Sequence, residues 1–405
     1  MRVLVTAKVK AVTPNSQLLL SFLRTFRDWT QYIINEIWEL NYIPSMKELH
    51  HKFYRILRKQ GFRAHHCHKI ERRAREIVKA TKKNKGSKPI LRKLTARLDS
   101  QDYRLDIESK VLRVAVLNSE WIELKLIWYN YLNRYFNSKW KLKEILISYK
   151  DKSTWVYFTF EKEVEVKSPR AIMGVDINFN NITYTIIDLR GKLVSMGIMP
   201  FTGLIRALTH RKISEKLQKK YPKSWRFNKK VLEVIRKHYR RARNILIDSS
   251  HYVSRRVVEI AREYNAVIIL EDLNKLRTRA NGSKKFNWKL SLWVYRRIQA
   301  FIHYKALLEE LMVTYVDPKG TSKTSPLGGE LEFINYRWIK LPNGIVTTRD
   351  VIASWNLALK GLSTYRRCIP HVVGGGMKAL EGDETPIPMK GKLVQVPIVS
   401  KITKR

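Results

Sequence analysis

The sequence predicts a mixed α/β protein, in which a small antiparallel β-sheet or barrel with an inserted helical domain precedes an α/β domain. Two periodicities in the first half support this. Apolar residues recur every three to four positions after a first strand, as in amphipathic helices, and alternate between about residues 100 and 168, as in strands with one buried face. From Ala171 onward, short apolar runs followed by helical stretches favour an α/β layer.

The N-terminal half begins with a strand over residues 1–11, and Pro14-Asn15-Ser16 then signals the start of a long amphipathic helix. Further helices are expected near residues 45–59 and from about 68 to 82. The third helix has a narrow apolar face and a broad basic face. Its basic residues are candidate nucleic-acid contacts, and they are Arg72, Arg73, Arg75 and Lys79.

The second half is expected to open with three strands, at residues 171–176, 182–189 and 192–198, followed by a long basic helical region at 223–262 and a buried strand at 266–270. The apolar positions predicted to face inward in that helical region include Val231, Val234 and Ile235. The outward basic positions are candidate phosphate contacts, although a merely solvated helix face is the alternative: Lys230, Arg236, Lys237, Arg240, Arg241 and Arg243.

The charge of the chain points to a polyanionic partner. Its 405 residues include 79 Lys and Arg against 35 Asp and Glu, which gives a formal net charge of +44. With 44% hydrophobic and 11% aromatic residues, the composition is that of a folded protein and not of a disordered basic tail. Such an excess of positive charge repels itself unless a polyanion neutralises it, so nucleic acid is the expected partner.

Cysteine usage and hydropathy exclude other classes of protein. The two cysteines rule out a disulfide framework and a four-cysteine zinc site. No segment approaches the roughly 18 to 20 uninterrupted apolar residues of a spanning helix, and the N-terminus has no signal-peptide layout. We therefore expect no membrane partner and a cytoplasmic, nucleoid-associated protein.

Three carboxylates stand at the ends of predicted elements in the second half. Asp176 closes the first strand, Glu271 closes the strand at 266–270, and Asp350 opens a helix at 351–362. Acids at strand ends converge at one edge of a sheet, and three of them in so basic a chain suit two Mg²⁺ or Mn²⁺ ions that hydrolyse a phosphodiester. Asp350 could instead cap its helix, and Glu271 or its neighbour Asp272 could cap a turn.

Motifs around these acids resemble those of TnpB (OrfB) proteins, the transposon-encoded, RNA-guided DNA nucleases related to type V CRISPR effectors. The resemblance runs in order from about residue 170 to 362. It rests on Gly174-Val-Asp176 with Asn180-Asn181-Ile182-Thr183, Ile-Ile-Leu-Glu271-Asp272-Leu-Asn274, Tyr304-Lys305-Ala306, Val316-Asp-Pro318, Thr321-Ser322, and Arg349-Asp350-Val-Ile-Ala353-Ser-Trp-Asn356.

The resemblance implies a RuvC-like nuclease of RNase H fold with Asp176, Glu271 and Asp350 as catalytic metal ligands. It also implies a guide RNA made from the transposon end and a double-stranded DNA target read next to a short flanking motif. The implied domains are a wedge-like β-barrel at 1–12 and 96–168, a helical recognition insertion at 13–95, the nuclease domain at 169–317 and 345–362, a degenerate zinc knuckle at 318–344, and a loosely docked tail at 363–405.

One segment departs from the family. The four positions that match the family's knuckle cysteines are Ser325, Gly328, Lys340 and Asn343, so no zinc is expected. The segment is expected to fold through its apolar residues instead, and these are Leu331, Phe333, Tyr336 and Trp338. Because the knuckle helps relatives admit the DNA strand, its loss puts the efficiency of cleavage in question while the acids are kept.

Two further alternatives stay open. His65-His66-Cys67-His68 has soft metal ligands, but consecutive helical residues point in different directions, which favours a solvated or RNA-facing segment. The functional alternatives to an RNA-guided endonuclease are an RNA-guided DNA binder with weak or no cleavage, and a nucleic-acid-binding transposition accessory protein whose acids are structural.

Overall fold

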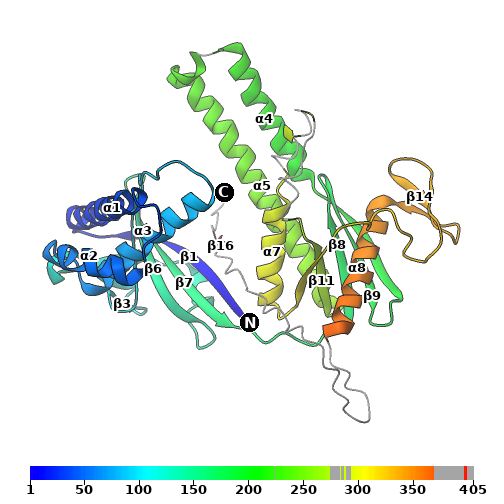
Figure 1. Cartoon of the computed structure of the whole chain (residues 1–405), viewed down its shortest axis with the longest axis horizontal. Coiled ribbons are helices and arrows are strands. Elements are labelled where there is room, and N and C mark those ends of the chain that lie inside the picture. Colours follow the sequence, from blue (N-terminus) through cyan, green and yellow to red (C-terminus); the bar gives the residue numbers. More distant parts are fainter. Residues whose placement is uncertain (223, 274–282, 284–286, 289–292, 369–395, 399–405) are drawn as a thin grey trace, which may run out of the picture. The chain divides into compact units, whose positions relative to one another are not determined.

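The computed structural model describes residues 1–222, 224–273, 283, 287–288, 293–368 and 396–398, and the chain divides into two compact units (Figure 1). The N-terminal unit comprises Arg2–Glu163 together with strand β16 (Val396–Ile398). The C-terminal unit begins at Val164 and includes Met1. Among the described residues, no helix combines the length and the apolar character needed to cross a membrane.

The N-terminal unit is built on an eight-stranded sheet with the order β2-β6-β7-β1-β5-β4-β3 and with β16 beside β1. The strands are β1 (Arg2–Val12), β2 (Leu94–Leu98), β3 (Tyr103–Asp106), β4 (Val111–Ala115), β5 (Trp121–Ile127), β6 (Lys141–Lys150) and β7 (Ser153–Glu163). Within the described residues no pairing joins β2 to β3, so the observed order is that of an antiparallel sheet, one of the two forms that the sequence predicts.

The helical insertion consists of α1 (Ser16–Trp38), α2 (Met46–Lys59) and α3 (Ala64–Lys83), so the three predicted helices are confirmed. A capping box starts α2, in which the Ser45 side chain accepts from the Glu48 backbone and Glu48 accepts from the Ser45 backbone. Helix α3 begins four residues before the predicted start. Its first turn is stabilised by burial of His66 and Cys67, which a pattern of apolar residues does not reveal.

The C-terminal unit contains a five-stranded sheet with the order β10-β9-β8-β11-β12. The strands are β8 (Ala171–Ile177), β9 (Asn181–Asp188), β10 (Leu193–Pro200), β11 (Ala266–Glu271) and β12 (Val313–Val316). Strands β8, β9 and β10 are antiparallel neighbours, whereas β11 runs parallel to both β8 and β12. The carboxyl ends of β8 and β11 therefore lie side by side.

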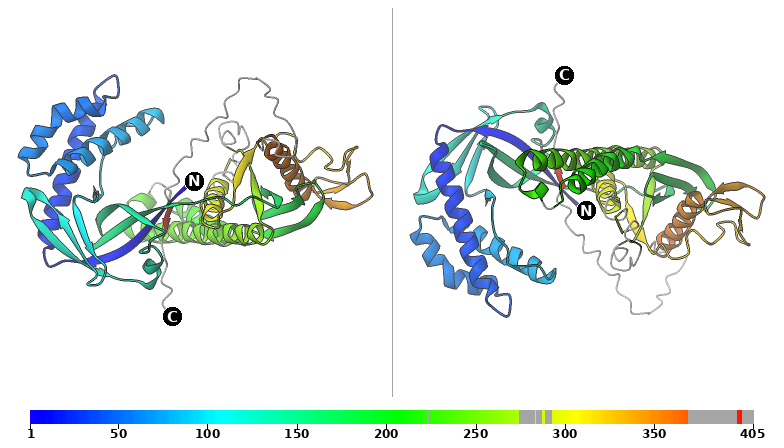
Figure 2. Two further views of the ribbon diagram at one scale, coloured as in Figure 1. Left: turned by 90° about the horizontal axis from the view of Figure 1, so that it is seen from below. Right: turned by 90° about the horizontal axis from the view of Figure 1, so that it is seen from above.

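Helices cover both faces of this sheet (Figures 1 and 2). Helices α4 (Thr202–Lys220), α5 (Lys229–Glu263) and α7 (Tyr295–Leu308) pack on one face, and α8 (Arg349–Cys368) packs on the other. The alternation of β8 separates the two cores, because Met173 and Val175 join the α5 side whereas Ile172 joins the α8 side. Asp176 lies four residues after Ile172 on the same strand, so both side chains point to the same face of the sheet, the face covered by α8.

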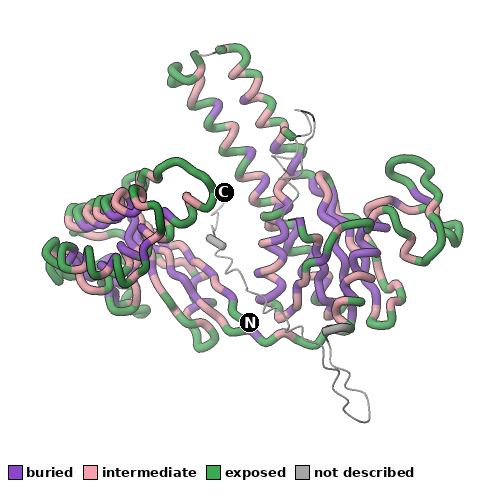
Figure 3. Tube along the Cα trace, in the orientation of Figure 1, coloured by how far each residue is buried: buried purple, intermediate pink, exposed green. Residues whose placement is uncertain are grey.

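Helices α4 and α5 form a hairpin whose far end is largely exposed (Figure 3). Burial in α5 is continuous only from about Leu246 onward, where the helix meets the sheet. The prediction that Val234 faces inward is wrong: its side chain is 43% exposed, because near this end of α5 the neighbouring Ile235 occupies the buried position. The far part of the hairpin is therefore a basic arm rather than a core element.

A three-stranded sheet precedes α8, and it consists of β13 (Glu332–Phe333), β14 (Trp338–Lys340) and β15 (Val346–Thr348). The expectation that Phe333, Tyr336 and Trp338 form its core is wrong, because all three are exposed. Leu331 is partly buried against the α8 core. Ile339 and Leu341 are fully buried there, so they anchor the segment.

The C-terminal part of the chain, from residue 363 onward, is only in part the loose tail that the sequence predicts. Two parts of it belong to regular elements. Helix α8 continues to Cys368, and β16 pairs in parallel with β1, with Val396 opposite Val5 and Ile398 opposite Ala7. The remaining tail residues, 369–395 and 399–405, lie outside the described residues.

Candidate active site

Asp176 and Glu271 lie at the carboxyl ends of adjacent parallel strands. Val175 pairs with Leu270, so the next residue on each strand is one of the two acids. In β11, Glu271 follows Val267 and Ile269 at alternate positions, so it points to the same face of the sheet as these two core residues on the α8 side. Both carboxylates therefore face α8. The amide of Gln299 donates to the backbone carbonyl of Glu271 at 2.8 Å and fixes the end of β11.

Asp350 reaches the same place from the first turn of α8. Its Oδ2 accepts a hydrogen bond from Nδ2 of Asn181, on β9, at 3.0 Å. The side chain that caps this helix is Thr348, whose hydroxyl accepts from the backbone of Val351 at 3.4 Å. The alternative in which Asp350 serves as the N-cap is thus not what the structure shows.

The three carboxylates line one cleft of about 530 Å³. Burial first, and then the charges of Glu271 and Asp350, raise the pKa of Asp176 well above its usual value, against a hydrogen bond from Asn178 at 2.7 Å. Burial also raises the pKa of Glu271 to about 7, with Lys360 acting in the opposite direction. Asp272 is exposed, so Glu271 is the member of that pair that faces the cleft.

This donor set fits hard divalent cations. Oxygen-only ligands are what Mg²⁺ and Mn²⁺ prefer, and a cation would offset the cost of burying neighbouring carboxylates. Among the described residues, the one group with three ligand atoms within 4.8 Å of one another is His50, His68 and Glu71. The three carboxylates of the cleft therefore do not all lie within 4.8 Å of one another. Asp176 feels the charges of both other acids, so a cation bound beside it would reduce this repulsion.

The raised pKa of Glu271 predicts a pH dependence of stability without metal. The folded state holds the proton up to about pH 7, whereas the unfolded state releases it near pH 4.3. The free energy of unfolding should therefore fall as pH rises through this window, by about 4 kcal/mol in total from this group, and level off above it. Urea unfolding in a chelator at pH 5 and pH 7.5 measures the slope. Glu271→Gln should be markedly flatter than the wild type, and equal slopes would contradict the assignment.

Other side chains shape the cleft, and the sequence gives them no role in it, although Ser322 and Arg349 stand in the quoted motifs. The Arg349 guanidinium donates to Ser322 Oγ at 3.1 Å and lies 5.5 Å from the ring of Tyr336, which is 87% exposed. Trp293 Nε1 donates to the carbonyl of Asn178 at 3.1 Å. The one available signal is the position of Arg349 next to Asp350, in a motif already tied to the site.

Asn356 fixes the loop that forms one wall of the cleft. Its side-chain amide donates to the carbonyls of Thr321 and Thr324, both at 2.7 Å. One residue of α8 therefore holds the segment that carries Thr321 and Ser322. This explains why an asparagine six residues after Asp350 belongs to the motif.

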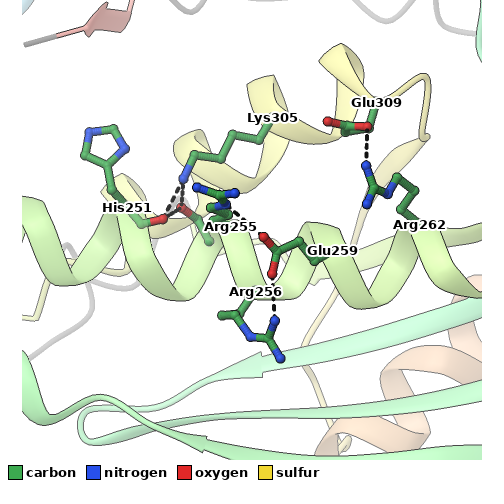
Figure 4. A network of polar contacts seen from close by, with 8 residues as sticks. His251, Arg255, Arg256, Glu259, Arg262, Lys305 and Glu309 are labelled. Atoms are coloured by element: carbon green, nitrogen blue, oxygen red, sulfur yellow. Dashed lines mark hydrogen bonds and ion pairs between the residues drawn. The ribbon is translucent and has the colours of Figure 1, made fainter. Parts of the chain in front are cut away.

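Lys305 links α7 to α5 on the face of the sheet opposite α8 (Figure 4). Its ammonium donates to the carbonyl of His251 at 2.6 Å and to Ser254 Oγ at 2.8 Å. Burial, with Arg255 adding to it, lowers the pKa of Lys305 to about 8. On the exposed surface beside it, Arg262 pairs with Glu309 at 3.3 Å.

We expect Lys305→Ala to lower the free energy of unfolding by about 2 kcal/mol, because it removes two hydrogen bonds of a charged group and the packing of the alkyl chain. Arg262→Ala breaks an exposed ion pair between α5 and Glu309, the residue that follows α7, and should cost about 0.5 kcal/mol or less. Denaturant unfolding of the two variants compares them directly. Equal losses of stability would show that the contacts of Lys305 contribute no more than an exposed ion pair does.

The basic residues of α3 divide into two groups. Arg73 donates to the carbonyl and hydroxyl of Thr95, at 3.0 and 2.7 Å, and Arg75 donates to the carbonyl of Pro44 at 2.7 Å. These two arginines tie the helix to its surroundings. Arg72 and Lys79 are exposed and are the members of the set best placed for a partner.

The candidate residues of α5 are all exposed, and they are Lys230, Arg236, Lys237, Arg240, Arg241 and Arg243. None of them forms an ion pair with a described residue. Their outward orientation agrees with the sequence prediction. Whether they contact a nucleic acid remains a prediction.

The positions matching the family's zinc knuckle make turns and one ion pair. Ser325 Oγ accepts from the backbone of Leu327 at 3.3 Å, and Asn343 Oδ1 accepts from that of Ile345 at 3.2 Å. Lys340 pairs with Glu332 across β13 and β14 at 3.0 Å. Gly328 has a φ of +77°, which favours glycine.

The histidine cluster of α3 is split by the fold. His66 and Cys67 are fully buried, so the expectation of a solvated segment is wrong for them, whereas His65 is exposed and lies 3.1 Å from Asp99. His68 stacks on His50 of α2, with ring centroids 4.4 Å apart. Together with Glu71, these two histidines supply a donor set that fits a transition-metal ion, and one of its members lies on another helix, where sequence spacing gives no signal.

Comparisons with known proteins identify the class. A family model described as Cas12f1-like, TNB domain, matches residues 295–357, from α7 to the first half of α8. A solved Cas12f1–sgRNA–target DNA complex contains a chain of the same fold, with a TM-score of 0.58 and 13% identity, over 86% of this chain and 83% of that one. The fold is thus that of Cas12 effectors, a mixed α/β architecture.

Curated relatives then give the family. A TnpB-like protein of Methanocaldococcus jannaschii is 31% identical over 260 residues, which cover 62% of this chain and 91% of that protein. A CRISPR-associated endodeoxyribonuclease Cas12f2 from a Micrarchaeota archaeon is 28% identical over 51% of this chain and 38% of its own length. The chain belongs to the TnpB family, which is related to type V effectors.

Proposed function

We propose that this protein is an RNA-guided DNA endonuclease with a RuvC-like site of RNase H fold. The observation that carries the proposal is the cleft in which Asp176, Glu271 and Asp350 meet, within a chain of net charge +44. Placing the buried Asp176 beside the partly buried Glu271 and Asp350 is costly unless cations bind them, and a basic surface is costly unless a polyanion binds it. A metal-dependent reaction on a nucleic acid meets both requirements.

The residues of the cleft would have different roles in the reaction. Asp176, Glu271 and Asp350 would hold Mg²⁺ or Mn²⁺ ions, because all three carboxylates line the cleft. Such ions activate a water and stabilise the leaving oxygen of a phosphodiester. Asn178 and Asn181 orient two of the carboxylates through hydrogen bonds of 2.7 and 3.0 Å. Arg349 lies at the cleft wall, where it can hold a backbone phosphate of the strand to be cut.

The nucleic-acid partners follow from the family. The solved Cas12f1 relative is bound to an sgRNA and a target DNA, and the Cas12f2 relative is an endodeoxyribonuclease. We infer partners of the same kind here, with the guide made from the transposon end and with cleavage beside a short flanking motif. The N-terminal unit would then act as the wedge and recognition region that reads this motif.

A second candidate is an RNA-guided DNA binder that cuts weakly or not at all. The observation that favours it is the chemistry of the four knuckle positions, Ser325, Gly328, Lys340 and Asn343, which carry no thiolate. If the segment must hold zinc to admit a DNA strand, binding would survive and cutting would not.

The test begins with the protein purified from its native locus together with its RNA. The RNA is sequenced, and the complex is incubated with Mg²⁺ and a plasmid library with randomised sequence beside the target. Depletion of one flanking motif supports the endonuclease. A discrete RNA with motif-selective binding but intact plasmids would support the guided binder. The absence of any discrete RNA would overturn both and favour a transposition accessory protein.

A further inference from the structure

A second hollow in the C-terminal unit is lined by arginines. It encloses about 420 Å³ where α4, α5 and the start of α7 meet. Arg211 comes from α4, Arg240 and Arg243 from α5, and Arg297 from α7. The other described residues that line it are Tyr239, Ala242, Leu246 and Val294, so none of its described lining residues carries a negative charge.

The four guanidinium groups lack hydrogen-bond acceptors and ion-pair partners within the described part of the chain. No hydrogen bond or ion pair joins any of them to a described residue, and the Nε atom of Arg211 is buried without an acceptor. Arg211 lies over the ring of Tyr239 at 4.3 Å, which holds its position but does not satisfy its donors. Arg297 is partly buried, and its burial and the charge of Arg243 lower its pKa.

Such an arrangement is unfavourable for the protein alone. Four like charges around one hollow repel one another, and a buried guanidinium donor without an acceptor costs free energy. A bound tetrahedral oxyanion would offset both costs, because its negative charge reduces the repulsion and its oxygens accept hydrogen bonds from several guanidinium groups at once. The aromatic and aliphatic lining of Tyr239, Leu246 and Val294 leaves space for the less polar atoms attached to that anion.

We propose that this hollow is a binding pocket for one backbone phosphate of a nucleic-acid strand, with Arg211, Arg240, Arg243 and Arg297 converging on it. The inference rests on the proposed function, since that function supplies the strand. A phosphodiester fits better than a free anion, because the hollow of about 420 Å³ is larger than a phosphate group and two of its arginines, Arg240 and Arg243, belong to the basic face of α5. The strand is either the guide RNA or the target DNA, and these share the chemistry of the phosphate.

Double-mutant cycles test whether the arginines share one phosphate. Arg243→Ala and Arg297→Ala should each weaken binding about tenfold and lower the salt-dependence slope by about one. Because both arginines contact the same phosphate, the affinity of the double variant should fall by a factor clearly smaller than the product of the two single-variant factors. The matched control is Arg236→Ala, an exposed arginine seven residues before Arg243 on α5, outside the pocket. In the variant that combines Arg236→Ala with Arg297→Ala, the loss of affinity should equal the product of the two single-variant losses.

Two binding assays identify the strand. One measures the affinity of the protein for the RNA that copurifies with the wild type, and the other measures the affinity of the assembled complex for target DNA. A loss in the first assay assigns the guide RNA, and a loss confined to the second assigns the target. Changes of less than twofold in both, or independent losses in the Arg243–Arg297 cycle, would overturn the pocket.

Failure of the pocket and failure of the proposed function look different. If the wild type binds RNA and cuts DNA while the pocket variants are unchanged, only the pocket is wrong. If the wild type binds no nucleic acid, both proposals fail. Arg297→Lys keeps the charge but loses the forked donor geometry, so it should recover only part of the affinity. Thermal unfolding of each variant verifies that it folds.

Discussion

Asp176→Asn should abolish DNA cleavage, with a loss of at least about a thousandfold, while affinity for RNA and target DNA changes by no more than a few fold. Asp176 lines the cleft with Glu271 and Asp350 and feels the charges of both, so its loss should disrupt the proposed metal site. The amide has nearly the same shape, so the end of β8 and its hydrogen bond to Asn178 need little rearrangement.

The same substitution should stabilise the protein when metal is absent. Asp176 is only 7% exposed, and its charged form is disfavoured by burial and by Glu271 and Asp350. Asparagine removes that repulsion, so the melting temperature in a chelator should rise by a few degrees. Added Mg²⁺ should raise the melting temperature of the wild type and leave that of the variant almost unchanged.

Asp272→Asn is the matched control, because Asp272 is an exposed acid beside Glu271 that does not line the cleft. It should keep cleavage within about threefold and keep the stabilisation by Mg²⁺. A combined loss of cutting and of nucleic-acid binding in Asp176→Asn would contradict a metal role. It would favour the alternative in which the acids are structural.

The elements around the site could be predicted because local pattern and tertiary environment agree there. The apolar run before Asp176 and the run before Glu271 are both buried strands. Parallel pairing then brings their ends together without any further information. Asp350 could be placed at a helix start, but its orientation toward Asn181 depends on β9, which sequence spacing does not encode.

The errors arise where burial comes from distant partners. The alternation over about residues 100 to 168 does not delimit β6, because its first residues, Lys141 to Glu144, are mostly polar. Phe333 and Tyr336 look like core residues by composition, whereas the packing against α8 is made by Ile339 and Leu341. Arg297 lies on α7, far from Arg243 in the sequence, so only the fold brings the two arginines together.

Gly174→Ala is expected to be the most damaging single-methyl change in the C-terminal unit. Gly174 lies two residues before Asp176, on the face of β8 that meets α8. A Cβ added there would stand 2.0 Å from the carbonyl oxygen of Ser354 and 2.5 Å from the backbone nitrogen of Ala358. Both atoms belong to the helix backbone and have no rotamer that could move them away.

The helix must therefore shift as a body, and Asp350 in its first turn shifts with it. We expect a loss of stability of about 3 kcal/mol or more, since overpacking against rigid backbone is poorly relieved. A displacement of about 1 Å at a reacting group costs on the order of a hundredfold in rate. Cleavage should fall at least that far at temperatures where circular dichroism shows a folded chain.

Gly86→Ala separates this effect from a general cost of replacing glycine. Gly86 is exposed, and an added Cβ would meet the side-chain methyl of Thr81 at 2.9 Å, a contact that a side chain can relieve. Its stability and cleavage should stay near those of the wild type. If Gly174→Ala also kept full cleavage and full stabilisation by Mg²⁺, Asp350 would not depend on the close approach of α8 to β8. Its place as the third ligand would then have to be abandoned, because a carboxylate that tolerates such a shift does not hold an ion in fixed geometry.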